Sequence, residues 1–245
     1  MIPIRWGGPE LTPTILPLPF MFETLLQLDN DILLAVNGLH CEFFDYFMRE
    51  CSRKFVWIPF YAAIFVLLCS RFTLKTSILA LLFITLTITL CDQLSASLLR
   101  PMVGRLRPAN PDNPLSQWVH VVNNYRSGRH GFPSSHAANT AGLTFFCIRL
   151  FRRRFLSWLF VGWMLLVCYS RIYLGVHYLG DLMAGMLLGF IVATLAYWAF
   201  SAMTRRLQLT TEQRSTPYDR YFLALPPAAF LLVVAWMLIW ATIHL

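Results

Sequence analysis

The chain has 245 residues, of which 57% are hydrophobic and only 13% are charged, and its formal net charge is +8. Globular domains carry about 25% charged residues, so this composition excludes an ordinary soluble domain and favours a membrane protein. The positive charge does not indicate nucleic-acid binding, because the basic residues gather at the ends of apolar stretches.

The first part of the chain contains no apolar stretch long enough to cross a membrane. Five prolines among the first 19 residues predict an irregular start. Apolar residues then recur at helical spacing, interrupted by Glu23, Asp29 and Asp31, which is typical of an amphipathic helix in the membrane interface. Residues 1–53 are therefore predicted to form an N-terminal interfacial segment without a cleavable signal peptide, and Met21 stays open as an alternative start.

Six apolar stretches follow, and each approaches the roughly 20 residues that a helix needs to cross a membrane. An all-α polytopic membrane bundle is therefore the predicted fold, with a membrane core over residues 54–203 and a loop and last span over 204–245. The predicted spans lie near 54–71, 75–98, 135–151, 155–173, 181–203 and 221–244.

Basic residues concentrate in three connections, 71–75, 149–154 and 205–214, which fall on one side of the membrane if all six spans cross it. Because basic loops stay in the cytoplasm, this side is predicted to be cytoplasmic. The opposite side receives residues 100–134 and 171–181. It also carries several arginines, against the usual charge bias, so we expect an anionic ligand or lipid headgroups there.

The first motif on that side, residues 100–108, follows the end of the second predicted span. Arg100 and Arg107 present guanidinium groups, which stay charged and match phosphate oxygens with a rigid fork of donors. Such groups neutralise a phosphoryl group and hold it for in-line attack. The alternative is that both side chains only anchor the span at the interface.

The second motif, residues 133–136, opens the third predicted span. A helix N-terminus offers free backbone N–H groups that bind anions, and Ser134 or Ser135 is suited to cap it. The imidazole of His136 follows at once and suits proton transfer near neutral pH. The alternative is a capped helix start with a histidine that has no chemical role.

The third motif, residues 170–181, holds Arg171, His177 and Asp181. The last two are four residues apart and would share one face of a helix. Asp181 then keeps one imidazole nitrogen protonated and leaves the other free to attack phosphorus, although an acidic residue there is also an ordinary helix cap. Since charged groups at membrane depth are costly, the three motifs together predict one catalytic site.

The three motifs resemble those of the type 2 phosphatidic acid phosphatase superfamily, usually written KxxxxxxRP, PSGH and SRxxxxxHxxxD. The spacing matches at every position across residues 100–181. Arg100 stands where the family usually has Lys, and Ser135 stands where it usually has Gly, but every charge and proton carrier is kept. Further arginines on this side are candidates for a second phosphate or for the headgroup: Arg105, Arg126 and Arg129.

The resemblance implies a role for each motif residue. His177 would attack phosphorus and form a phosphohistidine, Asp181 would orient His177, and His136 would protonate the leaving oxygen and then activate water. The resemblance implies no metal and no cofactor, and the sequence shows no metal-ligand spacing. The residues expected to bind the phosphate are Arg100, Arg107, Arg171, Ser134 and Ser135.

The expected protein is therefore a membrane phosphatase that hydrolyses a lipid phosphate or diphosphate at the outer face of a bacterial-type inner membrane. Undecaprenyl diphosphate or a related envelope lipid is the favoured substrate. Lipid A phosphatase or phosphotransferase activity is the alternative, and a lipid transporter is a remote one. The expected partners are the bilayer and a lipid phosphate, with no nucleic acid. The oligomeric state and a disulfide between Cys41 and Cys51 are left open.

Overall fold

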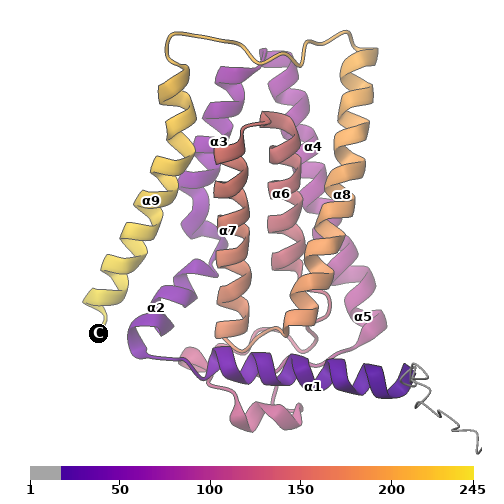
Figure 1. The fold of residues 1–245 in the computed structure, drawn as a ribbon, viewed down its shortest axis with the longest axis vertical. Coiled ribbons are helices and arrows are strands. Elements are labelled where there is room, and N and C mark those ends of the chain that lie inside the picture. Colours follow the sequence, from indigo (N-terminus) through magenta and orange to yellow (C-terminus); the bar gives the residue numbers. More distant parts are fainter. Residues whose placement is uncertain (1–17) are drawn as a thin grey trace, which may run out of the picture.

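The structure, a computed structural model, describes residues 18–245, and within them it contains helices and no β-strand (Figure 1). The irregular stretch predicted for the chain start lies almost wholly outside the described residues. A π-helical stretch, Leu94–Leu99, joins α4 to α5. The helices are α1 (Leu18–Asn37), α2 (Glu42–Cys51), α3 (Ile58–Arg71), α4 (Leu74–Gln93), α5 (Arg100–Val103), α6 (Ser135–Phe151), α7 (Arg154–Tyr173), α8 (Leu179–Arg206) and α9 (Asp219–Ile243).

Five helical stretches of the described chain are long and apolar enough to cross a membrane, and the predicted all-α membrane bundle is confirmed. The remaining predicted span corresponds to α6, which has 17 residues and so extends about 26 Å. It lies between α7 and α8 inside the bundle (Figure 1). The five stretches are Lys54–Arg71, Leu74–Val103, Arg154–Tyr173, Leu179–Arg206 and Asp219–Ile243.

Two glycines let α8 approach α6 closely. A Cβ atom at Gly185 would lie 2.4 Å from the carbonyl oxygen of Ser134, and one at Gly189 would lie 2.4 Å from that of Ala138. Small residues at such positions allow the backbones of membrane helices to meet. The start of α8 is thereby held beside the start of α6, which brings the third motif next to the second.

An aromatic cluster connects α3, α7 and α9. The rings of Trp57, Phe60, Trp163 and Phe230 pack with centroids 5.4 to 6.2 Å apart. Trp57 Nε1 also donates a hydrogen bond to the carbonyl oxygen of Cys51 at 2.9 Å. The cluster therefore fixes the turn between α2 and α3, which supplies side chains to the site described below.

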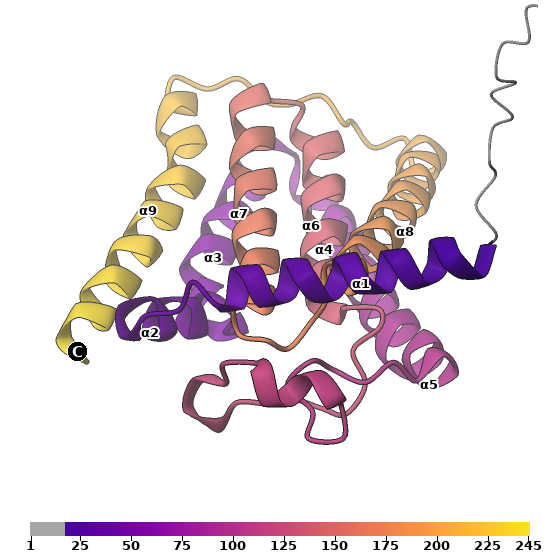
Figure 2. The same cartoon turned by 60° about the horizontal axis from the view of Figure 1, so that its bottom comes forward.

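The two ends of the bundle carry different parts of the chain. α1 lies across one end, and the connection 104–134 lies at the same end (Figures 1 and 2). The basic connections gather at the other end, where the Arg214 N–H donates to Arg71 O at 2.7 Å and the Gln213 amide donates to Phe151 O at 2.6 Å. The structure therefore places the three basic connections at the same end of the bundle, as predicted.

The cysteines of the interfacial segment are not paired. Cys41 is exposed and Cys51 is buried, and both are free. The Cys51 sulfur lies 3.4 Å from the Met237 sulfur on α9. The disulfide that the sequence left open is therefore not formed in this structure.

Candidate active site

The three motifs meet at the end of the bundle that α1 crosses. The Ser134 N–H donates to the Asp181 carbonyl oxygen at 2.9 Å, which links the start of α6 to the first turn of α8. The Arg107 guanidinium donates to the Val176 carbonyl oxygen at 2.9 Å, which links the first motif to the third. The eight predicted site residues are thus brought to one region.

His177 and Asp181 form the predicted pair, but not on a shared helix. Asp181 lies in the first turn of α8, whereas His177 lies before it, because Gly175 with φ +66° turns the chain out of α7. The His177 Nδ1 atom lies 3.2 Å from Asp181 Oδ2. The same oxygen accepts the Tyr178 N–H at 3.1 Å, so Asp181 also caps α8. Both side chains are buried, with exposed fractions of 1% and 0%.

Arg107 determines which nitrogen of His177 carries the proton. Arg107 Nη1 lies 2.7 Å from His177 Nε2, and a guanidinium only donates. Nε2 is therefore the acceptor, and Nδ1 bears the proton that points to Asp181. Burial and the positive charges of Arg107 and Arg171 hold the pKa of His177 well below its usual range. At neutral pH the imidazole is neutral, which is its nucleophilic form.

Three guanidinium groups near this imidazole each retain an unused donor. Within the described chain, the Nε atoms of Arg100, Arg107 and Arg171 are buried without a hydrogen-bond partner. Burial, followed by the charges of Arg171 and Arg100, lowers the pKa of Arg107 to about 10, so this group is still charged at neutral pH. Buried cations with unused donors are costly, and an oxyanion such as a phosphate group would satisfy them.

The two serines of the second motif have partners within the protein. Ser135 Oγ accepts hydrogen bonds from Arg100 Nη2 at 2.6 Å and from Ser95 Oγ at 2.8 Å. Ser134 is the N-cap of α6, where its Oγ lies 3.5 Å from the Ala137 N–H. Ser135 therefore orients Arg100 and Ser134 caps the helix, and contact of either serine with a phosphate stays a prediction.

Arg171, near the end of α7, is held by residues that no sequence motif marks. It donates to Ser52 Oγ and lies 3.4 Å from the hydroxyl of Tyr125. Ser52 comes from the turn after α2 and Tyr125 from the connection 104–134. Because neither contact is local in sequence, spacing along the chain gives no signal for them.

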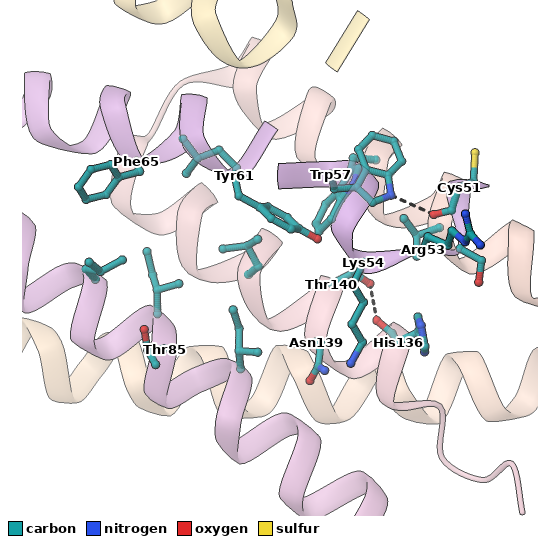
Figure 3. Close-up of a pocket in the computed structure, with 18 of the residues that line it drawn as sticks. Cys51, Arg53, Lys54, Trp57, Tyr61, Phe65, Thr85, His136, Asn139 and Thr140 are labelled. Atoms are coloured by element: carbon teal, nitrogen blue, oxygen red, sulfur yellow. Dashed lines mark hydrogen bonds between the residues drawn. The ribbon is translucent and has the colours of Figure 1, made fainter. Parts of the chain in front are cut away.

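His136 lies at one end of a cavity of about 400 Å³ between α3, α4, α6 and α7 (Figure 3). Asn139 and Lys54 line the same end, and Figure 3 shows the Lys54 side chain extending toward them. The cavity thus combines a polar, positively charged end with an apolar body, which suits an amphiphilic ligand. The apolar part of the lining includes Trp57, Ile64, Leu68, Leu81, Ile84 and Leu143.

The arginines considered for a second phosphate have other partners in the structure. None of residues 18–245 takes part in a group of three or more His, Cys, Asp or Glu side chains placed to hold a metal ion. Arg105 forms ion pairs with Asp29 and Asp181, Arg126 donates to the Ala109 carbonyl oxygen, and Arg129 pairs with Asp112.

Comparison with curated proteins gives relatives of known activity. The chain is 47% identical to a lipid A 4′-phosphatase of Bacteroides thetaiotaomicron over 191 aligned residues. The alignment covers 78% of this chain and 85% of that protein. It is 34% identical to a lipid A 4′-phosphatase of Porphyromonas gingivalis, over 71% of this chain and 74% of that protein. It is 28% identical to an undecaprenyl-diphosphatase of Sulfolobus acidocaldarius, over 72% of this chain and 77% of that protein.

Comparison with solved structures finds proteins of the same fold, and comparison with family sequences identifies the superfamily. LpxE of Aquifex aeolicus shares the fold with a TM-score of 0.50 and 20% identity, over 68% of this chain and 92% of that one. A PAP2-type phosphatidylglycerolphosphate phosphatase from Bacillus subtilis gives a TM-score of 0.51 and 20% identity, over 75% of this chain and 88% of that one. The PAP2 superfamily pattern matches residues 77–205, which contain all three motifs. The chain therefore belongs to the PAP2 superfamily and is a multi-pass membrane enzyme that hydrolyses lipid phosphates.

Proposed function

We propose that the protein removes a phosphate monoester from lipid A, or from a closely related acylated sugar phosphate, at the outer face of the inner membrane. The main support is the 47% identity to a lipid A 4′-phosphatase across 85% of that protein, together with the second relative of the same activity. Undecaprenyl diphosphate, which the sequence alone favoured, becomes the second candidate, supported by the relative of 28% identity.

In the proposed reaction, His177 Nε2 attacks the phosphorus of the lipid phosphate. The P–N bond forms while the P–O bond to the sugar breaks, and His136 gives a proton to the leaving sugar oxygen. His136 then takes a proton from a water molecule, whose oxygen attacks phosphorus, breaks the P–N bond and releases inorganic phosphate. Asp181 accepts the hydrogen bond from Nδ1 throughout and stabilises the positive charge on the phosphorylated imidazole.

Arg107 connects phosphate binding to release of the nucleophile. Without substrate, its guanidinium donates to the same Nε2 atom that must attack. An incoming phosphate would draw this donor onto its own oxygens and so free the Nε2 lone pair. The unused Nε–H groups of Arg100, Arg107 and Arg171 would bind the remaining oxygens and stabilise the charge of the transition state.

The cavity beside His136 is proposed to receive an acyl chain of the lipid. Its polar end lies at the catalytic histidine, and its apolar body runs between α3 and α4 (Figure 3). Phe65 on α3 and Leu81 on α4, which line it, are 48% and 40% exposed, and we expect the cavity to open between these two helices toward the lipid. The Lys54 ammonium would then contact the sugar or its acyl ester, next to the phosphate.

The substrate is tested by phosphate release from the purified protein in detergent. The panel contains bisphosphorylated lipid A, undecaprenyl diphosphate, phosphatidylglycerol phosphate and phosphatidic acid. We expect the highest kcat/KM with lipid A, and mass spectrometry of the product should show loss of the 4′-phosphate. The His177→Ala variant should release no phosphate. The matched control is His244→Ala, because this histidine is exposed near the end of α9 and contacts Trp240.

Each other outcome has a distinct meaning. A higher kcat/KM with undecaprenyl diphosphate than with lipid A would make undecaprenyl diphosphate the preferred substrate and would leave the assigned catalytic residues unchanged. Transfer of labelled phosphate to an added lipid alcohol, instead of to water, would identify a phosphotransferase. Equal release by the wild type and His177→Ala would refute the assigned nucleophile.

The side of the membrane can be tested with an endogenous thiol. Cys41 is exposed at the end of the bundle that holds the site, and the basic connections at the other end favour a cytoplasmic position there. A membrane-impermeant maleimide should therefore label Cys41 in intact spheroplasts, and Cys41→Ser should remove this label. Labelling that requires membrane permeabilisation would place the site on the cytoplasmic side.

A further inference from the structure

Arg105 lies between two carboxylates from different parts of the chain. Its Nη1 donates to Asp181 Oδ1 at 3.0 Å, and its Nη2 donates to Asp29 Oδ2 at 2.7 Å. Its guanidinium carbon also lies 3.9 Å from the centre of the Tyr178 ring. The guanidinium is largely buried, with 20% of the side chain exposed, so this bridge is better protected from solvent screening than an ordinary surface ion pair.

Asp29 makes a second contact with the same region. Its Oδ1 atom accepts the backbone N–H of Gly180 at 2.8 Å, in the first turn of α8. A Cβ atom at Gly180 would lie 2.8 Å from Asp29 Oδ2, so the absence of a side chain permits this approach. One carboxylate on α1 therefore holds both Arg105 and the backbone next to Asp181.

Arg105 supplies the hydrogen-bond donor for the second carboxylate oxygen of Asp181. Asp181 Oδ2 accepts from the Tyr178 N–H and from His177 Nδ1, whereas Oδ1 has Arg105 as its donor. The carboxylate is fully buried, and a buried charged oxygen without a donor is costly. Without Arg105, Asp181 would gain by rotating toward another donor, and His177 would lose its alignment.

We infer that Asp29 and Arg105 are positioning residues for the reaction, acting through Asp181 to hold His177 ready for attack. The inference rests on the proposed roles of His177 and Asp181. It makes α1 a part of the catalytic apparatus of this chain, although α1 lies outside the matched PAP2 residues 77–205.

The same helix also presents apolar side chains outward. Leu25 and Leu28 on α1 are 62% and 52% exposed, on a helix that crosses the end of the bundle (Figure 2). Apolar side chains of this kind insert into the boundary of a bilayer. The carboxylate of Asp29 thus links a helix at the membrane surface to the nucleophile.

The test compares kcat and KM of Asp29→Asn, Arg105→Gln and Arg105→Lys on whichever lipid phosphate the wild type hydrolyses. Asp29→Asn keeps an oxygen for the Gly180 N–H but loses the ion pair. Because Arg105→Gln removes a charged donor from the buried Asp181 carboxylate, we expect it to lower kcat by about 10- to 100-fold with little change in KM. Asp29→Asn should give a smaller decrease, and Arg105→Lys should recover part of the loss.

Two matched controls separate this effect from a general loss of charge. Asp31→Asn alters an exposed carboxylate on the same helix, which accepts a hydrogen bond from Gln27 Nε2, and Arg220→Gln removes an exposed guanidinium in the first turn of α9, which donates to the Tyr221 hydroxyl. Both should leave kcat unchanged. The double variant Asp29→Asn/Arg105→Gln should be no slower than Arg105→Gln alone, since Asp29 acts through Arg105.

Several results would overturn the inference. Wild-type kcat in Arg105→Gln would show that Asp181 needs no second donor. Losses that multiply in the double variant would show that Asp29 acts independently. A change in KM alone would make Arg105 a substrate-binding residue. These results differ from failure of the proposed function, in which the wild type itself would release no phosphate from lipid A.

Discussion

The close contact between α6 and α8 predicts the effect of a single methyl group. The carbonyl oxygen of Ser134 would lie 2.4 Å from a Cβ atom at Gly185, whereas ordinary contact begins at 3.4 Å. In Gly185→Ala the two helices must therefore separate locally by about 1 Å. A carbonyl oxygen of the helix backbone cannot rotate away as the end of a flexible side chain can, so the strain falls on the helix positions.

That separation acts on the chemistry because each helix carries a different catalytic group. His136 lies in the first turn of α6, and Asp181 lies in the first turn of α8. A misplacement of about 1 Å costs about 100-fold in rate, and overpacking of a core costs about 1–3 kcal/mol of stability. We therefore expect Gly185→Ala to remain folded in detergent with a lower melting temperature and to lose about 100-fold in kcat.

The matched control is Gly162→Ala on α7, where an added Cβ meets no atom within 4 Å. This substitution should keep wild-type activity and gain about 0.5–1 kcal/mol of stability, because alanine favours a helix over glycine. Phosphate release and the melting temperature are measured on both variants. Near-wild-type kcat in Gly185→Ala would refute the reasoning that this contact sets the distance between the two catalytic groups.

Three further predictions concern the site itself. The pKa of His177 in the folded protein lies below its unfolded value of about 6.5, so the unfolded state binds more protons below that pH. Between about pH 7.5 and pH 5.5 the free energy of unfolding of the wild type should therefore fall relative to that of His177→Gln, by up to about 1.4 kcal/mol per pH unit. The melting temperature of the wild type should fall more than that of the variant, and parallel curves would contradict this. Ser52→Ala removes the hydroxyl that Arg171 bonds and should lower kcat/KM by about 5- to 10-fold; unchanged kinetics would show that Arg171 needs no such support. Ile84→Trp fills the cavity beside His136 and should raise KM for long-chain lipids but not for p-nitrophenyl phosphate, whereas equal effects on both would place the acyl chain elsewhere.

Sequence reasoning succeeded where the determinant is local. Apolar run lengths predicted the helices, and the motif spacing placed Arg107, His136 and His177 at the same end of the bundle. Helix α6 shows the limit of run length, because most of its 17 residues are buried between neighbouring helices and none is fully exposed, so it need not meet the length of an isolated span.

The contacts that orient the site could not be predicted, because they join distant segments. Asp29 reaches Gly180 across 151 positions, and Ser52 reaches Arg171 across 119. Asp29 and Ser52 both belong to the N-terminal segment 1–53, whose sequence pattern predicted only an interfacial helix. The position of His177 before α8 was also missed, since the turn depends on the left-handed conformation of Gly175, and an i, i+4 pair alone does not reveal it.

Trapping the phosphorylated enzyme would identify the nucleophile directly. Wild type and His136→Gln are mixed with ³²P-labelled p-nitrophenyl phosphate, whose good leaving group needs little protonation, and quenched with base. We expect a base-stable, acid-labile label on His177 that persists longer in His136→Gln, since this variant activates water poorly, and no label in His177→Ala. Label on another residue, or rapid turnover without any labelled protein, would show that His177 is not the nucleophile.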